Sequence, residues 1–191
     1  EYKDLFWASC GGGGGNFGII TQMELKVYPA NDVTWFNIGW GWNDPVDQVI
    51  STWLSFFSKQ DLNFFSHLDL WAKPFPEDKL KKRPIKVLGY FWGSPEEAKK
   101  QLQPFLSIGS PTVVIEKATW KKAIEDIEDS TAVFLTDKPE YKSPGAYVKD
   151  TLPKEAIDLI HTTLKNSTSP LLNVLLFSMG GKAAEVAPDA T

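Results

Sequence analysis

Five consecutive glycines, Gly11 to Gly15, are the part of this sequence that points most clearly to chemistry. Glycine loses more backbone freedom on folding than any other residue, so such a run is costly unless the backbone must bend sharply or approach another molecule closely. The N–H groups of a tight loop can donate hydrogen bonds to a phosphate, or to the edge of a flavin or adenine ring. The alternative is a flexible linker, but linkers usually mix glycine with serine over a longer span, and apolar residues flank this short run.

The segments on either side of the glycines limit the kind of site they can form. Gly13, Gly15 and Gly18 have the G-x-G-x-x-G spacing of a Rossmann unit, in which the motif follows a strand and opens a helix. Here the order is reversed, because residues 2–9 read as the end of a helix and residues 19–28 alternate with the period of a half-buried strand. The Rossmann interpretation therefore fails, and the sequence favours a glycine loop that a following strand anchors beside a cofactor.

Three further side chains could react or bind a metal: Cys10, His67 and His161. A lone cysteine beside glycines is more often inert than reactive. Neither histidine has another ligand at the spacing of a metal site, so a structural or solvated role is favoured for both. The sequence therefore predicts no metal site.

The pattern of the chain from Val33 onward predicts the elements that must position such a site. Strand, helix, strand, strand, helix and strand follow one another, which is the ferredoxin-like βαββαβ plan. We therefore expect an α+β fold, with an antiparallel sheet and helices on one face. A later helix and strand predict more than four strands in the sheet. The predicted segments are 33–42, 43–59, 66–74, 85–93, 94–107 and 111–118, then a helix at 119–127, an irregular stretch at 128–150, a helix at 153–165 and a strand at 171–181.

Two predicted strands carry a face of mixed aromatic and polar side chains. Such a face suits the wall of a ligand pocket, whereas the alternating Leu68 and Leu70 suit helix packing. The alternative is a sheet surface that faces a partner or is half-exposed. The predicted substrate-lining residues are Asp69, Trp71, Tyr90 and Trp92, and His67, Lys73 and Leu88 share their face.

The composition limits the partners. The 191 residues carry a net charge of −4 with a pI near 5.2, which argues against a nucleic-acid surface. The apolar runs are shorter than the ~20 residues that span a bilayer, so we expect no membrane partner. The 42% of hydrophobic residues is enough for a sizeable core.

The segment DLFWASCGGGGGNFGIITQMELKVYP, residues 4–29, resembles the glycine-rich motif of the berberine-bridge-enzyme-like FAD-linked oxidases, whose FAD domain has the p-cresol methylhydroxylase fold. PKEAIDLIHTTL and the final GGKAAEVAPDAT are similar to segments of the substrate domain of that family. Cys10 departs from the pattern, since it stands where the family usually has arginine, which puts in doubt any cofactor contact made by that side chain.

The resemblance implies a division of the chain and a cofactor. Residues 1–30 would be the C-terminal piece of an FAD-binding domain, and residues 31–191 most of a substrate domain. The residues that attach the flavin and the catalytic base are expected outside this chain, so this piece alone is expected neither to hold FAD tightly nor to turn over. Carried over by position, the FAD-contacting residues are Gly14, Gly15, Asn16, Gly18 and Ile19.

The function implied is that of an FAD-dependent oxidase. Its substrate would be a small organic molecule such as a sugar or a secondary metabolite, with molecular oxygen as the electron acceptor. Two alternatives stay open: a ferredoxin-like binding module whose sheet aromatics stack on RNA bases, and an oligomerisation module without catalysis.

Overall fold

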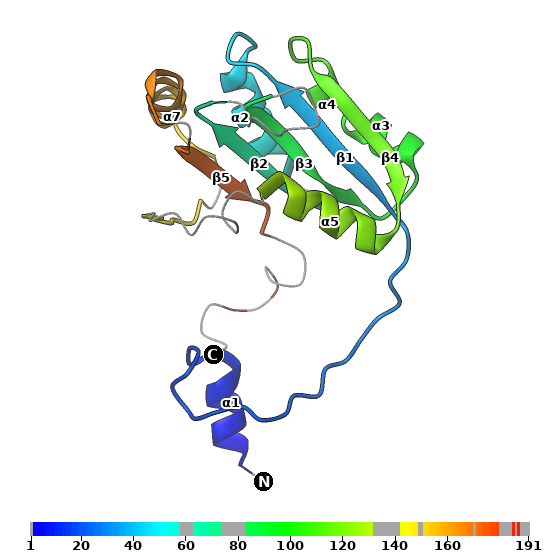
Figure 1. Cartoon of the computed structure of the whole chain (residues 1–191), viewed down its shortest axis with the longest axis vertical. Coiled ribbons are helices and arrows are strands. Elements are labelled where there is room, and N and C mark those ends of the chain that lie inside the picture. The colour runs from blue at the N-terminus through cyan, green and yellow to red at the C-terminus, as the bar shows by residue number, and fades with distance from the viewer. Residues whose placement is uncertain are drawn as a thin grey trace. The chain divides into compact units, whose positions relative to one another are not determined.

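The computed structural model describes residues 2–57, 63–73, 83–131, 142–148, 151–169 and 171–179, with residues 185 and 187 (Figure 1). For residues 128–131 it describes the backbone. The chain divides into two units, one of Glu1–Pro29 with Gly181–Thr191 and one of Ala30–Gly180. Of the predicted irregular stretch, residues 142–148 have no regular structure, and much of the rest lies outside the described residues.

The larger unit is built on a five-stranded antiparallel sheet with the order β4-β1-β3-β2-β5. The first four strands form the predicted ferredoxin-like plan, and β5 extends the sheet beside β2. This confirms the α+β fold class. The strands are β1 (Val33–Trp40), β2 (Phe64–Trp71), β3 (Ile85–Phe91), β4 (Thr112–Ala118) and β5 (Asn173–Phe177).

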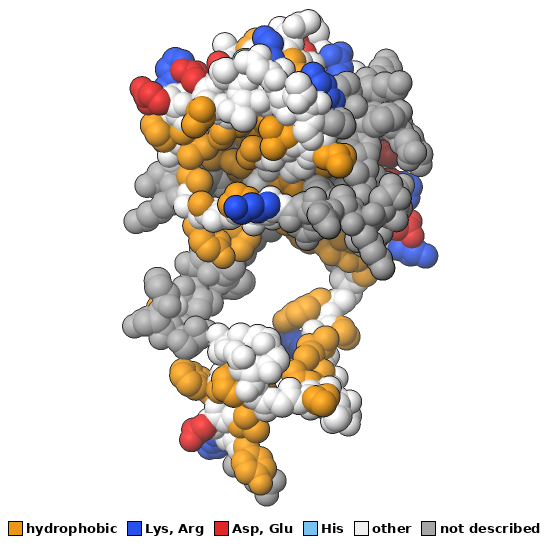
Figure 2. Space-filling view, turned by 60° about the vertical axis from the view of Figure 1, so that its left-hand side comes forward, with side chains coloured by type: hydrophobic (Ala, Val, Ile, Leu, Met, Phe, Trp, Pro, Cys, Tyr) orange, Lys and Arg blue, Asp and Glu red, His pale blue; other side chains and the backbone are white. Residues whose placement is uncertain are grey.

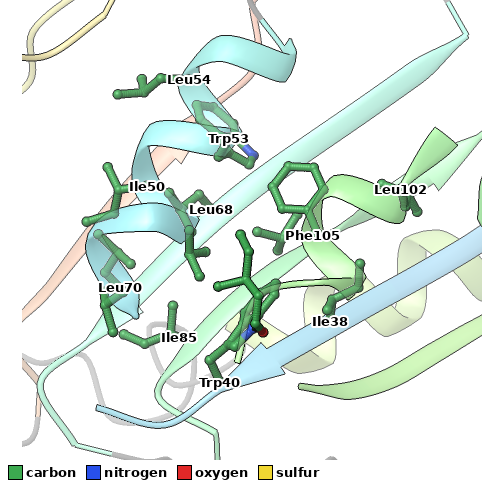
Figure 3. Close-up of a cluster of buried hydrophobic side chains, with 14 of the residues drawn as sticks. Ile38, Trp40, Ile50, Trp53, Leu54, Leu68, Leu70, Ile85, Leu102 and Phe105 are labelled. Atoms are coloured by element: carbon green, nitrogen blue, oxygen red, sulfur yellow. Dashed lines mark hydrogen bonds between the residues drawn. The ribbon is translucent and has the colours of Figure 1, made fainter. Parts of the chain in front are cut away.

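Helices pack on one face of this sheet and enclose the main core. Alternate strand residues such as Phe36, Ile38 and Leu68 point to this face and are fully buried. Figure 3 shows Ile50 and Trp53 packing against this layer. The helices that contribute to the core are α2 (Val46–Phe57), α3 (Pro95–Gln101), α4 (Gln103–Leu106) and α7 (Lys154–Asn166).

Local sequence signals set where the helices begin and end. Ser94 forms the predicted capping box with Glu97: its hydroxyl accepts a hydrogen bond from the Glu97 N–H at 3.2 Å, and the Glu97 carboxylate accepts one from the Ser94 N–H at 3.0 Å. The helix predicted over 94–107 is two helices, α3 and α4, which meet at Leu102. Pro104 explains the break, because proline lacks the N–H that a continuous helix needs.

The opposite face of the sheet is covered at one end by α5 (Trp120–Thr131), as Figure 1 shows. Ala123 of this helix is buried against Val33 and Trp35 of β1 and Leu88 of β3. The sheet therefore has two cores, a large one under α2, α3, α4 and α7 and a small one under α5.

The smaller unit contains α1 (Lys3–Gly11), which ends in the glycine run as predicted. The strand predicted over residues 19–28 is wrong, because that segment has no strand partner and no regular structure. Its apolar side chains are exposed, Ile19 by 93% and Val27 by 85%, and Figure 2 shows hydrophobic side chains at the surface of the unit that carries α1. Alternation describes which faces a strand would have, but a strand also needs a neighbour for its N–H and C=O groups.

Gly89 in β3 leaves no room for a side chain and gives a direct test of the packing between β2 and β3. A Cβ atom there would lie 1.9 Å from the carbonyl oxygen of Phe65 in β2, a backbone atom that cannot move aside alone. Gly89→Ala should therefore lower the free energy of unfolding by about 3 kcal/mol or more, since overpacking costs ~1–3 kcal/mol even where side chains can adjust. Urea unfolding of the chain measures this.

Gly145→Ala is the matched control, because a Cβ atom there meets nothing within 4 Å. We expect its unfolding midpoint to stay at the wild-type value. Equal stability of the two variants would show that β2 and β3 do not approach as described.

Candidate functional site

The glycine loop surrounds a hollow of about 510 Å³ within the smaller unit. All five residues assigned to FAD by sequence lie on it. Besides them, Cys10 and Phe17 contribute to the wall, so the position at which the resemblance leads one to expect arginine lies at the hollow. The complete lining is Leu5, Ser9, Cys10, Gly11, Gly13, Gly14, Gly15, Asn16, Phe17, Gly18, Ile19 and Ile20.

The glycines of the loop are required for different reasons. A Cβ atom at Gly12 would lie 2.6 Å from both the Ala8 carbonyl oxygen and the Phe17 ring, so Gly12 is needed for packing within the loop. Gly15 has a φ of +75°, which disfavours any side chain. Gly14 has neither constraint, because a Cβ atom there meets nothing within 4 Å and its φ is not in the left-handed region. Gly14 is therefore bare backbone beside open space, which suits a planar group lying against the loop.

The second candidate region is the sheet face that α5 covers in part. Four polar side chains are buried on it, which is unusual for groups that water would otherwise solvate. Asp69 of β2 pairs directly with Lys86 of β3, and the two are 1% and 5% exposed. The four are Asn37, His67, Asp69 and Lys86.

Asp69 is the least satisfied of these groups. Neither of its carboxyl oxygens has a hydrogen-bond partner among the described residues. Burial raises the pKa of Asp69 to about 7, and the nearby charge of Lys86 opposes that rise. A buried carboxyl group with two open oxygens can accept hydrogen bonds from a ligand, and near neutral pH it can accept or return a proton.

His67 lies two residues earlier on the same face, between two aromatic rings. Its ring centroid is 4.8 Å from that of Phe65 and 4.3 Å from that of Phe177, both edge-on. Burial lowers the pKa of His67 to about 4, and its Nδ1 atom has no partner in the described part of the chain. The imidazole is therefore neutral near pH 7. The sequence placed it on the same face as Asp69 but favoured a structural or solvated role for it.

Aromatic side chains form the other end of this face. Tyr90 is 8% exposed and Trp92 is 42% exposed, and their ring centroids are 4.9 Å apart. Trp120 of α5 stacks on Trp92 at 5.5 Å and meets Tyr90 edge-on at 4.8 Å. Of the four predicted substrate-lining residues, the structure brings Tyr90 and Trp92 together and buries Trp71. It places Asp69 beside Lys86 rather than beside the rings.

Lys86 is the site residue that sequence reasoning missed. Its position was readable, because it lies two residues before Leu88 on the same alternating face. That it faces Asp69 depends on the register between β2 and β3, which the sequence does not reveal.

The other reactive side chains lie elsewhere. His161 of α7 has its Nδ1 atom 2.8 Å from an Asp47 carboxylate oxygen of α2 and stacks on Trp42, an arrangement that ties the two helices together. Cys10 is an exposed thiol. Among the described residues, no three histidine, cysteine or acidic side chains are grouped as metal ligands would be, and no helix is long and apolar enough to cross a membrane.

Comparison with known proteins identifies the relatives of this chain, although no family model matches it. It is 36% identical over 191 residues to the uncharacterized FAD-linked oxidoreductase YgaK of Bacillus subtilis, covering 100% of this chain and 40% of that protein. It is 29% identical to YvdP of the same organism, another uncharacterized FAD-linked oxidoreductase, covering 99% of this chain and 41% of that protein. It is 27% identical to berberine bridge enzyme-like 21 of Arabidopsis thaliana, covering 99% of this chain and 37% of that protein.

Over nearly its whole length the chain is therefore similar to proteins named FAD-linked oxidoreductase and berberine bridge enzyme-like, as a fragment of such a protein would be. It spans about two fifths of the length of the curated relatives it matches. The resemblance carried by the glycine motif is thereby confirmed over the whole chain.

The opposed titrations of Asp69 and His67 predict an unusual dependence of stability on pH. The folded state keeps the Asp69 proton up to about pH 7, whereas the ordinary pKa of an aspartate is 3.8, so this group lowers stability as pH rises from about 4 to 7. The folded state loses the His67 proton near pH 4, whereas the ordinary pKa of a histidine is 6.5, so this group raises stability as pH rises over about the same range. The contributions are about 4 and about 3 kcal/mol, and they nearly cancel.

Single variants should separate the two effects. In His67→Phe, the Asp69 contribution remains, and stability should fall by about 4 kcal/mol between pH 4 and pH 7 relative to the double variant His67→Phe/Asp69→Asn, which lacks both groups. In Asp69→Asn, the His67 contribution remains, and stability should rise by about 3 kcal/mol up to pH 6.5. Urea unfolding across this range measures both, and all other carboxylates are common to the two variants. Parallel pH curves for the two variants would contradict the burial of this pair.

Proposed function

We propose that this chain is part of an FAD-dependent oxidase of a small organic substrate such as a sugar or a secondary metabolite, with molecular oxygen as the electron acceptor. The observation that carries the proposal is Gly14, bare backbone at a hollow in the glycine loop of a chain that is 36% identical over 191 residues to an FAD-linked oxidoreductase. FAD would supply the hydride acceptor, as the cofactor does in such enzymes. The residues that would hold it are Gly14, Gly15, Asn16, Gly18 and Ile19.

The fit of these residues to FAD has a physical basis. Asn16 donates a hydrogen bond from its side-chain amide to the Gly12 carbonyl oxygen at 2.8 Å, which holds the loop in its turn. The positive φ values at Gly13, Gly15 and Gly18 bend the backbone repeatedly, so that successive N–H groups can face one side. A loop of this kind donates hydrogen bonds without placing any Cβ atom between itself and a flat ligand.

On the sheet face, the chain would bind and orient the substrate. The open oxygens of Asp69 suit a ligand that donates hydrogen bonds, and a hydroxyl group is the simplest such donor. Tyr90 and Trp92 offer aromatic surface to the apolar part of the same molecule. The strong burial of Tyr90 and His67 argues against the alternative of an RNA-binding sheet, which needs its stacking rings exposed.

The experiment is a substitution that disturbs a bound cofactor but not the loop itself. In the full-length flavoprotein, Gly14→Val should reduce the flavin absorbance of the purified protein at least about tenfold, since only a molecule lying on the loop would meet the new side chain. Gly145→Val, also beside open space in this chain, is the matched control and should keep the wild-type flavin content. A Gly14→Val protein with a full complement of flavin would refute the assignment of the loop.

We further propose that residues 1–191 alone do not hold FAD tightly and do not turn over, because the relatives devote about three fifths of their length to parts absent here. Equilibrium dialysis of this chain against FAD is expected to give no stoichiometric binding. Stable one-to-one binding would contradict this.

A further inference from the structure

Lys86 has a place in the site that its sequence context does not suggest. It lies in the middle of the sheet, on β3, directly across from Asp69 on β2. On its other side, Lys86 pairs with Gly39 of β1. Because glycine has no side chain, no side chain of β1 lies directly beside Lys86 at this position. A lysine is rarely buried to this degree unless an interaction compensates for the hydration that its ammonium group loses.

Lys86 lies opposite Asp69 but does not donate a hydrogen bond to it. Directly paired residues of adjacent antiparallel strands have Cβ atoms about 4.5–5.5 Å apart, so the two side chains leave the sheet side by side, and the charge of Lys86 acts to lower the pKa of Asp69. Yet neither Asp69 oxygen accepts a hydrogen bond from Lys86 or from any other described residue. A closed salt bridge would occupy those oxygens, whereas this arrangement leaves them open.

No other charged group of the described chain faces Asp69 closely enough to replace this effect. On β2 its neighbours on the same face are His67, which is neutral near pH 7, and Trp71. On β5 the paired residue is Leu175, which is apolar. Burial favours the protonated form of Asp69, and Lys86 is the group that opposes it.

We propose that Lys86 is a positioning residue of the substrate site, whose charge favours the ionised form of Asp69 while both Asp69 oxygens are left without a partner among the described residues and available to a hydroxyl-bearing substrate. The inference rests on the proposed function for the identity of the ligand, but the coupling of the two residues is a property of this chain alone. It follows that Lys86 sets the lowest pH at which Asp69 is ionised and binds the substrate, although Lys86 itself need not touch the substrate.

The first test measures Asp69 directly in the 191-residue chain, by carbon-13 NMR of its carboxyl group, assigned with Asp69→Asn. Lys86→Met should raise the titration midpoint of Asp69 by about one pH unit or more, and Lys86→Arg should leave it near the wild-type value. Lys117→Met is the control, since Lys117 is an exposed lysine of β4 paired with Asp32. An unchanged midpoint in Lys86→Met would overturn the proposal. If that variant does not fold, Lys86→Gln takes its place under the same criterion.

The second test uses the full-length flavoprotein with a hydroxylated substrate that reduces its flavin. Lys86→Met should move the acid limb of kcat/KM to higher pH by the same interval as the NMR midpoint, with the rise in KM rather than a fall in kcat, and Lys86→Arg should restore the wild-type profile. A purely structural role would lower activity equally at every pH. A shifted NMR midpoint without a shifted pH profile would overturn the substrate role of the pair. A full-length protein purified without flavin would refute the proposed function, and the NMR titration would then still test the coupling between Lys86 and Asp69.

Discussion

The register between β2 and β3 is the constraint on which the rest of the larger unit depends. It sends Leu68, Leu70 and Val87 into the core under the helices and places Asp69 opposite Lys86 on the other face. Gly89 makes the pairing possible, because any side chain there would meet the Phe65 carbonyl group. A slip of one residue would exchange the two faces, burying the charged pair under α2 and exposing the apolar residues.

The two faces of the sheet serve different physical purposes. The face under α2, α3, α4 and α7 holds mostly apolar side chains, and its buried indole N–H groups have partners: that of Trp53 donates to the Ser66 hydroxyl at 3.1 Å, and that of Trp40 to the Ile108 carbonyl oxygen at 2.8 Å. On the opposite face, Asp69 and His67 are buried with polar atoms unpartnered among the described residues. Buried polar groups without partners destabilise a fold, and an unpartnered carboxyl group costs more than the single Nε2 atom of His161 on the helix side, which also lacks a partner in the described part of the chain. This cost is the reason for which the sheet face is proposed as the substrate site.

The glycine loop presents the same contrast on a smaller scale. Gly12 and Gly15 are explained by the loop itself, through close contact and a positive φ, whereas Gly14 has no such reason within this chain. Its place at the hollow, unlike that of Gly145, is what makes it a candidate for a ligand lying against the loop. The two proposed sites thus each depend on one residue, Gly14 in the loop and Asp69 on the sheet face.

The sequence by itself determined the fold class, the faces of the strands, the capping box at Ser94 and the glycine loop, because these depend on local periodicity and on the conformations open to single residues. It also led to a wrong strand at 19–28, since alternation cannot supply the neighbour that a strand requires. Only the tertiary structure decided that Lys86 faces Asp69 and that His67 is neutral between two rings. Pairing across strands and loss of water are properties of the packed sheet, and no local pattern encodes them.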